Sequence, residues 1–236
     1  MANRSDINIM VCGIGSVETL NQMAALDVDF VGLDCRKNSE KSVKLINSLT
    51  GTLPDRAAFD VSALDEKPYR VGVFQDDMPQ DIVTRVYNYH LDYVQLSGEE
   101  SAVMIENLRR TLDPDIRKGI KIIKTIRIET ADDLKKCAEY EGVADFFIFE
   151  VSDNCGEKGV NGGEKEDVSS DLNLLNDYQG ATPFLLDVGI SASSLDALRQ
   201  FSHPKFAGIN INAEAESAQG EKDIDAIREF VAALRA

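Results

Sequence analysis

Short runs rich in β-branched and aromatic residues alternate with longer amphipathic stretches along the whole chain, and this alternation restricts the possible folds most strongly. Strands are expected at 7–11, 30–33, 70–74, 93–96, 120–126, 146–149, 184–187 and 207–211. Between these runs, apolar residues recur at three- and four-residue spacing, which is typical of helices that bury one face. Helices are expected at 17–26, 79–88, 101–112, 130–140, 193–201 and 223–234.

This order of elements predicts the fold class. Alternating strands and helices imply parallel strands with helices outside them, and eight repeats close as a barrel more naturally than they extend as an open sheet. The length of 236 residues lies within the range in which such a barrel forms one domain. We therefore predict an α/β protein consisting of a single (β/α)₈ barrel of the TIM type over residues 1–236. Ser16, Thr130 and Ser191 are candidate N-caps, and Pro79 suits a first helical position.

Two segments interrupt the alternation. Residues 151–170 are rich in Gly, Asn, Asp and Glu and follow the sixth expected strand. They suit either a solvated insertion or a mobile loop over the mouth of the barrel, where active sites of this fold lie. Residues 44–68 lack a clean helical period and are expected to hold a short helix and a loop without chemistry.

Charge and cysteine content exclude several classes of function. A formal net charge of -16 repels nucleic-acid phosphates and anionic lipid surfaces, so neither partner is expected. No stretch approaches the ~18 apolar residues of a membrane span. The four cysteines form no C-x-x-C pair and there are two histidines, so we expect no disulfide framework and no metal site. These features favour a soluble, cytoplasmic protein.

Four segments resemble the phosphoribosylanthranilate isomerase family in order and spacing. M-V-C-G at 10–13 resembles the family's K-[IV]-C-G. V-G-V-F at 71–74, followed by D-Y-V-Q-L-S-G-E-E from Asp92, is similar to its V-G-V-F and V-Q-L-H-G-[DE]-E. I-K-T-I-R-I from Ile123 is similar to its fifth strand. D-V-G-I from Asp187 and A-G-I-N-I-N-A-E-A-E-S from Ala207 resemble its A-G-G-[LI] and D-x-S-S-G-V-E.

The resemblance implies an intramolecular aldose–ketose isomerase of tryptophan biosynthesis. Its reaction is the Amadori rearrangement of N-(5′-phosphoribosyl)anthranilate, without a cofactor, and its partner is that small phosphorylated substrate, bound by a monomer or a homodimer. The family's base, the cysteine of K-x-C-G, corresponds to Cys12. Its acid, an aspartate that ends strand six, corresponds to Glu150. A free thiol titrates near ~8.5, so Cys12 needs a neighbouring cation or helix N-terminus to act as a base at neutral pH.

Candidate substrate-binding residues follow from the same resemblance. The family's carboxylate-binding arginine, in S-P-R, corresponds to Lys41. Arg36 in the same loop could replace it, or Arg36, Lys37 and Lys41 could form a solvated basic cluster. Because Lys124 and Arg127 are an odd number of positions apart, strand alternation lets only one of them point inward; Arg127 is the substrate-binding candidate.

Departures from the family concentrate at the site. Met10 replaces a lysine that would share a strand face with the catalytic cysteine, and Ser97 replaces the histidine of Q-L-H-G. The family's phosphate cradle consists of backbone N–H groups after strands seven and eight, and its first half keeps Gly189. The other half reads Asn212, Ala213 and Glu214, and the acid would oppose a bound phosphate.

These departures leave other readings open besides an active, diverged isomerase. One is a catalytically impaired or repurposed paralogue that binds another small ligand. Another is a barrel enzyme that acts on a different phosphorylated sugar, which would need the same cradle.

Overall fold

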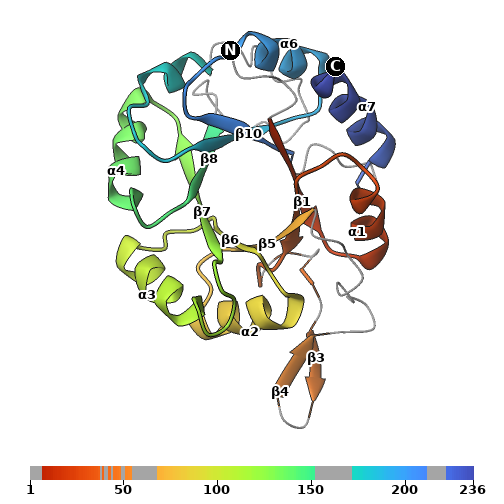
Figure 1. The fold of residues 1–236 in the computed structure, drawn as a ribbon, viewed down its shortest axis with the longest axis vertical. Helices are drawn as coiled ribbons and strands as arrows, with labels where there is room; N and C mark the ends of the chain where they lie inside the picture. Colours follow the sequence, from red (N-terminus) through yellow and green to blue (C-terminus); the bar gives the residue numbers. More distant parts are fainter. Residues whose placement is uncertain are drawn as a thin grey trace.

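The computed structural model confirms the predicted (β/α)₈ barrel (Figure 1). It describes residues 7–37, 39, 42–43, 45–48, 51–54, 68–151, 172–211 and 222–236. Parallel strands close in the order β1-β10-β9-β8-β7-β6-β5-β2, and the helices lie around the outside.

The barrel strands match the eight expected runs. They are β1 (Asn8–Ile14), β2 (Phe30–Asp34), β5 (Tyr69–Phe74), β6 (Tyr93–Leu96), β7 (Lys121–Ile128), β8 (Phe146–Val151), β9 (Phe184–Val188) and β10 (Phe206–Ile211). The helices are α1 (Val17–Ala24), α2 (Pro79–Tyr89), α3 (Ala102–Leu112), α4 (Cys137–Tyr140), α6 (Ala192–Gln200) and α7 (Ile224–Arg235), with 3₁₀ helices η2 (Ala131–Lys136) and η3 (Leu175–Asp177).

The expected helix starts lie at the predicted residues. Ser16 and Ser191 cap α1 and α6 by accepting backbone N–H bonds, and Pro79 opens α2. The stretch expected as one helix at 130–140 begins instead as η2, where the Asp133 carboxylate accepts the backbone N–H of Thr130 at 2.8 Å, and it becomes α-helical only in α4.

The segment 44–68 does not contain the expected short helix in its described part. Residues 45–54 include two strands, β3 (Leu45–Ser48) and β4 (Gly51–Pro54), which pair antiparallel across a two-residue connection. Figure 1 shows this hairpin projecting from the barrel. Each of these strands is too short to show whether its apolar residues follow a helical period. Antiparallel pairing of the two strands satisfies their backbone N–H and C=O groups.

Side chains inside the barrel form layers from alternate strands, as this fold requires. The first layer is aromatic, with Phe30 of β2, Tyr93 of β6 and Phe146 of β8; the ring centroids of Phe30 and Tyr93 are 5.1 Å apart. The next is aliphatic and comes from the intervening strands: Met10, Val71, Ile123 and Leu185. These layers fill the amino-terminal part of the barrel, which leaves its carboxyl-terminal end for polar side chains.

An aspartate precedes each aromatic residue of the first layer and ties neighbouring strands together. Asp29 accepts the backbone N–H of Ile9 at 2.9 Å, and Asp92 accepts that of Arg70 at 2.9 Å. Asp145 does the same for β7, through the N–H of residue 122 at 2.8 Å. The repeated Asp-aromatic pair therefore fixes strand register at the end of the barrel opposite the site.

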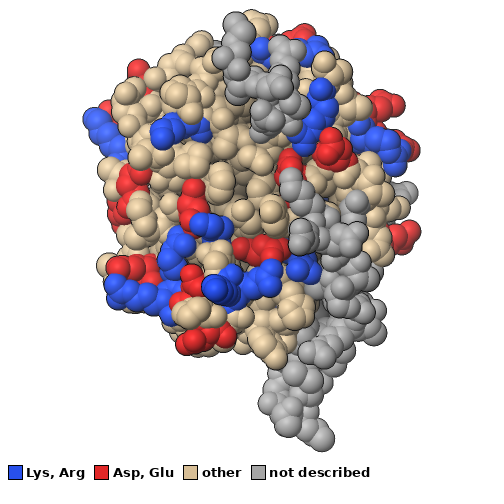
Figure 2. All heavy atoms as spheres, in the orientation of Figure 1, with Lys and Arg blue, Asp and Glu red and all other residues tan. Residues whose placement is uncertain are grey.

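Charged side chains of both signs are interspersed on the face shown in Figure 2, where described Lys and Arg residues lie beside Asp and Glu. In the described part of the chain, no helix has the length and apolar character needed to cross a membrane.

Candidate active site

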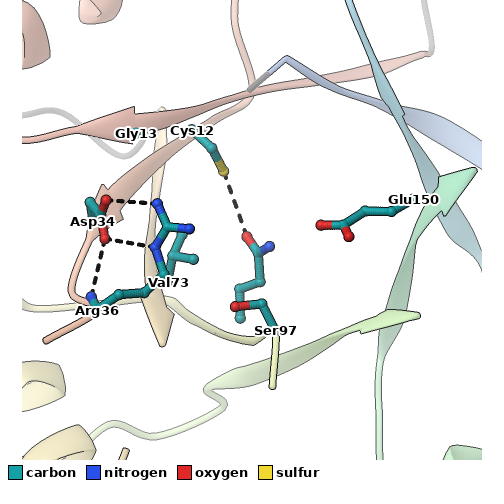
Figure 3. Close-up of a pocket in the computed structure, with 8 residues that line it drawn as sticks. Cys12, Gly13, Asp34, Arg36, Val73, Ser97 and Glu150 are labelled. Carbon is teal, nitrogen blue, oxygen red and sulfur yellow. Dashed lines mark hydrogen bonds and ion pairs between the residues drawn. The ribbon is translucent and has the colours of Figure 1, made fainter. Parts of the chain in front are cut away.

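A pocket opens at the carboxyl ends of the barrel strands (Figure 3). Asp34 ends β2, Glu150 is the penultimate residue of β8, and Ser97 directly follows β6. Among the described residues, its lining is Cys12, Gly13, Asp34, Arg36, Val73, Gln95, Ser97 and Glu150. The pocket thus gathers residues that lie far apart in the sequence at the end of the barrel where this fold places its sites.

Backbone geometry places the Cys12 thiol at the pocket. Gly13 has a φ of 80°, and the pairing of β1 with β2 shifts register between Val11 and Ile14. A Cβ atom at Gly32 on the neighbouring strand would lie 2.4 Å from the Cys12 sulfur, so glycine there provides the space that the thiol occupies. Cys12 is only 3% exposed.

Two hydrogen bonds in series lead from the thiol on β1 across the barrel to β6 and β7. Cys12 Sγ donates to Oε1 of Gln95 at 3.6 Å, and Nε2 of Gln95 donates to Oγ1 of Thr125 at 3.0 Å. Both Gln95 and Thr125 are buried. The amide oxygen therefore accepts a hydrogen bond from the thiol, and the amide is held at its other end by a hydroxyl.

The surroundings of Cys12 favour its protonated form. Burial raises the pKa of the thiol far above its ordinary value, and the Asp187 carboxylate raises it further. Lys222 and Arg36 act in the opposite direction, so cations do face this cysteine although Met10 replaces the family's lysine. Their effect is smaller than that of burial, and Cys12 is a thiol in the free protein.

Arg36 and Asp34 form a bidentate pair at the edge of the pocket. Arg36 donates from Nε to Oδ1 at 3.0 Å and from Nη2 to Oδ2 at 2.8 Å, and Ser39 donates its hydroxyl at 2.5 Å. Burial acts to raise the pKa of Asp34, but the bonds from Arg36 and Ser39 outweigh it and hold that pKa below its usual value.

Two members of the alternative basic cluster, Arg36 and Lys37, each pair with a carboxylate. Arg36 is held against a buried carboxylate, and Lys37 pairs with Asp81 at 2.6 Å. Among the residues that the structure describes, Nη1 of Arg36 has no hydrogen-bond partner, so this part of the guanidinium is available to an anion. Lys41 lies outside the described residues.

Glu150 extends toward the pocket from β8, across from the pair of Asp34 and Arg36 (Figure 3). Its Oε2 lies 3.8 Å from Nη2 of Arg127, whose side chain is 68% exposed at the rim. Lys124 instead lies buried outside the barrel wall, 3.1 Å from Glu100. Of the two basic residues on β7, Lys124 therefore points outward and Arg127 lies on the side of the pocket.

The remaining candidates are only partly described. The Ser97 hydroxyl donates to the Phe74 carbonyl at 2.8 Å. Gly189 follows β9 and lies just before Ser191, the N-cap of α6. Asn212, Ala213 and Glu214 lie outside the described residues, as does 152–171, so the loop alternatives stay as predictions.

Several polar residues at this end of the barrel were not predicted from the sequence. Gln95 lay inside the quoted V-Q-L motif, and Asp34 and Thr125 lie on inward-facing strand positions that alternation could have identified. Asn210, which is 1% exposed, donates from Nδ2 to Oδ1 of Asp187 at 2.7 Å. No sequence signal connects residues on separate strands into such bonds.

Comparison with known proteins shows which family the chain resembles over its length. The family described as N-(5'phosphoribosyl)anthranilate (PRA) isomerase matches residues 9–233. The N-(5'-phosphoribosyl)anthranilate isomerase of Parabacteroides distasonis is 33% identical over 94% of this chain and 91% of that protein. That of Phocaeicola vulgatus is 29% identical over 96% of this chain and 97% of its own length.

Solved structures agree in fold. Phosphoribosyl anthranilate isomerase from Thermus thermophilus has a TM-score of 0.68 at 20% identity, with 97% of this chain and 98% of that chain covered. A phosphoribosyl anthranilate isomerase in complex with reduced 1-(o-carboxyphenylamino)-1-deoxyribulose 5-phosphate has a TM-score of 0.69 at 19% identity over 97% and 98% of the two chains. A family match across nearly the whole chain, together with the relative at 33% identity, shows that this protein belongs to the N-(5'-phosphoribosyl)anthranilate isomerase family.

Proposed function

We propose that this protein catalyses the Amadori rearrangement of N-(5′-phosphoribosyl)anthranilate to the corresponding aminodeoxyribulose phosphate in tryptophan biosynthesis. The observation that carries the proposal is that Cys12 of β1 and Glu150 of β8 line one pocket at the barrel mouth. Two groups able to exchange protons then flank a bound sugar, as an aldose–ketose isomerisation requires.

In this proposal Glu150 is the general acid and Cys12 the general base. Glu150 protonates the ring oxygen as the ribose opens to a cationic Schiff base. The Cys12 sulfur then takes the C2′ proton, and the electrons of that C–H bond form the C1′–C2′ double bond of the enamine. Because the raised pKa keeps Cys12 protonated in the free protein, its own proton must leave before this step, and the cationic intermediate favours the thiolate.

Charged groups around the pocket suit the anionic ends of this substrate. Nη1 of Arg36 points to a role in binding the anthranilate carboxylate, with the rest of the guanidinium held by Asp34. Arg127 lies at the opposite rim and supplies a second cation. We assign the phosphate to backbone N–H groups near Gly189 and the α6 N-terminus, with Asn212 and Ala213 completing the cradle.

The decisive experiment follows the fluorescence of N-(5′-phosphoribosyl)anthranilate after purified protein is added. Loss of fluorescence with the parent, but not with Glu150→Gln, is the expected result. If the parent binds the reduced product analogue but does not turn over substrate, the alternative of an impaired paralogue replaces this proposal. If it binds no phosphorylated ligand, the isomerase assignment fails and unphosphorylated ligands become the candidates.

We further propose a single-domain protein that acts in the cytoplasm as a monomer or homodimer. Light scattering coupled to gel filtration distinguishes the two oligomeric states.

A further inference from the structure

The buried amide of Gln95 lies between two groups that differ in their hydrogen-bonding capacity. On one side the Cys12 thiol donates to Oε1 at 3.6 Å, and on the other Nε2 donates to the Thr125 hydroxyl at 3.0 Å (Figure 3 shows the first contact). Gln95 is 5% exposed and Thr125 is 6% exposed. Water has little access to either group, so these contacts decide which orientation of the amide is satisfied.

The two partners respond differently to loss of a proton. A thiol can donate a hydrogen bond, whereas a thiolate only accepts one. The Thr125 hydroxyl both donates and accepts, so it can bond to either end of the amide. A half-turn of the Gln95 amide would therefore direct Nε2–H to the sulfur and Oε1 to the hydroxyl, with the same number of hydrogen bonds as before.

We propose that Gln95 is a positioning residue that serves both protonation states of Cys12 by turning its amide, with Thr125 bonding to its other end in each orientation. In the resting protein Oε1 accepts a hydrogen bond from the thiol. When that proton leaves for solvent or substrate, Nε2 donates to the thiolate and the Thr125 hydroxyl donates to Oε1. When the sulfur takes the C2′ proton, the amide returns to its first orientation.

The amide acts alongside several fixed charges that face Cys12. Asp187 at the end of β9 and Asp34 at the end of β2 oppose the thiolate, whereas Lys222 before α7 and Arg36 favour it. Each of these charges favours the same protonation state of Cys12, whether the cysteine is at that moment a thiol or a thiolate. The Gln95 amide is the neighbour whose contribution reverses sign when it turns, so it can stabilise the thiol at rest and the thiolate during turnover.

Gln95→Met tests this inference, because methionine fills similar space without a donor or an acceptor. The measurement is a pH titration of the Cys12 thiolate by its rate of alkylation at neutral to mildly alkaline pH, taken as the difference between each protein and the same protein carrying Cys12→Ser, because this rate follows the thiolate population. A hydrogen bond to a charged group is stronger than one to a neutral group. Loss of the turning amide should therefore move the Cys12 titration to higher pH by about one unit, a tenfold change in thiolate population.

The opposite sign would overturn the inference. If Gln95 were a fixed acceptor, its removal would destabilise only the thiol, and the titration would move to lower pH. An unchanged titration would mean that the amide stabilises the thiolate no more than the thiol, which would also overturn the inference. The infrared S–H stretch provides a second readout: in Gln95→Met it should shift to the frequency of an unbonded thiol, and Gln95→Leu replaces this variant if methionine prevents folding.

This inference rests on the proposed function for its catalytic meaning, but its test does not. The titration needs no substrate and reports on Cys12 in the unliganded protein. If the parent fails to convert N-(5′-phosphoribosyl)anthranilate, the proposed function fails while the titration still decides how the amide behaves. If the parent is active, Gln95→Met should lower kcat about tenfold and change KM little, since Gln95 acts through the base.

Discussion

Lys124→Met should destabilise the protein strongly, because it removes one half of a buried ion pair. The Lys124 ammonium lies 3.1 Å from Oε2 of Glu100, and the two side chains are 3% and 2% exposed. It also donates to the carbonyl oxygens of Leu96 at 3.4 Å and Gly98 at 2.5 Å. The turn after β6 therefore folds around this one cation.

The structure indicates how much stability the substitution removes. Without the ammonium, the buried Glu100 carboxylate keeps only backbone N–H bonds from Gly98 at 3.0 Å and Asp76 at 2.9 Å. Removing one partner of a buried pair typically costs about 3–5 kcal/mol. At roughly 2–4 °C per kcal/mol for a domain of this size, the melting temperature should fall by on the order of 10 °C.

Urea unfolding of the parent, Lys124→Met and the double variant Lys124→Met/Glu100→Gln measures the effect. The double variant removes both charges and should recover much of the lost free energy of unfolding, because the penalty arises from the unpaired carboxylate. A loss below about 1 kcal/mol in the single variant would refute the reasoning. A double variant no more stable than the single one would do the same, and would assign the effect to lost packing.

Three further predictions concern the pocket. Glu150→Gln should lower turnover about 100-fold in a steady-state assay, and Glu150→Asp should keep part of it; full activity in Glu150→Gln would place the acid elsewhere. Gly32→Ala should cost about 1–3 kcal/mol in urea unfolding, since the added methyl meets Cys12 Sγ at 2.4 Å, and wild-type stability would contradict the assigned packing. Asp34→Asn should be less stable than the parent at neutral pH, and the gap should close below about pH 4, because a carboxylate whose pKa is lowered by Arg36 contributes stability only while ionised. Equal unfolding free energies at pH 7 would rule out that contribution.

The fold was predictable because each strand carries its own signal. Runs such as 146–149 are continuous and apolar, as strands buried on both faces must be, and the helices between them show their period. The hairpin of β3 and β4 was missed because four-residue strands offer no period to count. Its pairing depends on contacts between segments, which local sequence does not report.

The candidate site was predictable only where one residue carries the signal. Cys12 and Glu150 could be placed at the mouth because each lies near the end of its own strand. The electrostatics of Cys12 could not be obtained in the same way. The sequence pointed to a missing cation at Met10, whereas the structure places Arg36 and Lys222 among the charges that act on the thiol.

Layering explains why the pocket is polar although the barrel interior below it is not. Each layer draws its side chains from alternate strands, so Cys12 and Thr125 come from one set of strands and Gln95 from the other. The hydrogen bonds from Cys12 to Gln95 and from Gln95 to Thr125 therefore join the two sets of strands. They form only when the barrel closes and when residue 32 is small enough to leave space for the sulfur. The hydrogen bonding of Cys12, and with it the reactivity of the thiol, consequently depends on residues of other strands. A substitution on one of those strands can change this reactivity without altering the M-V-C-G segment.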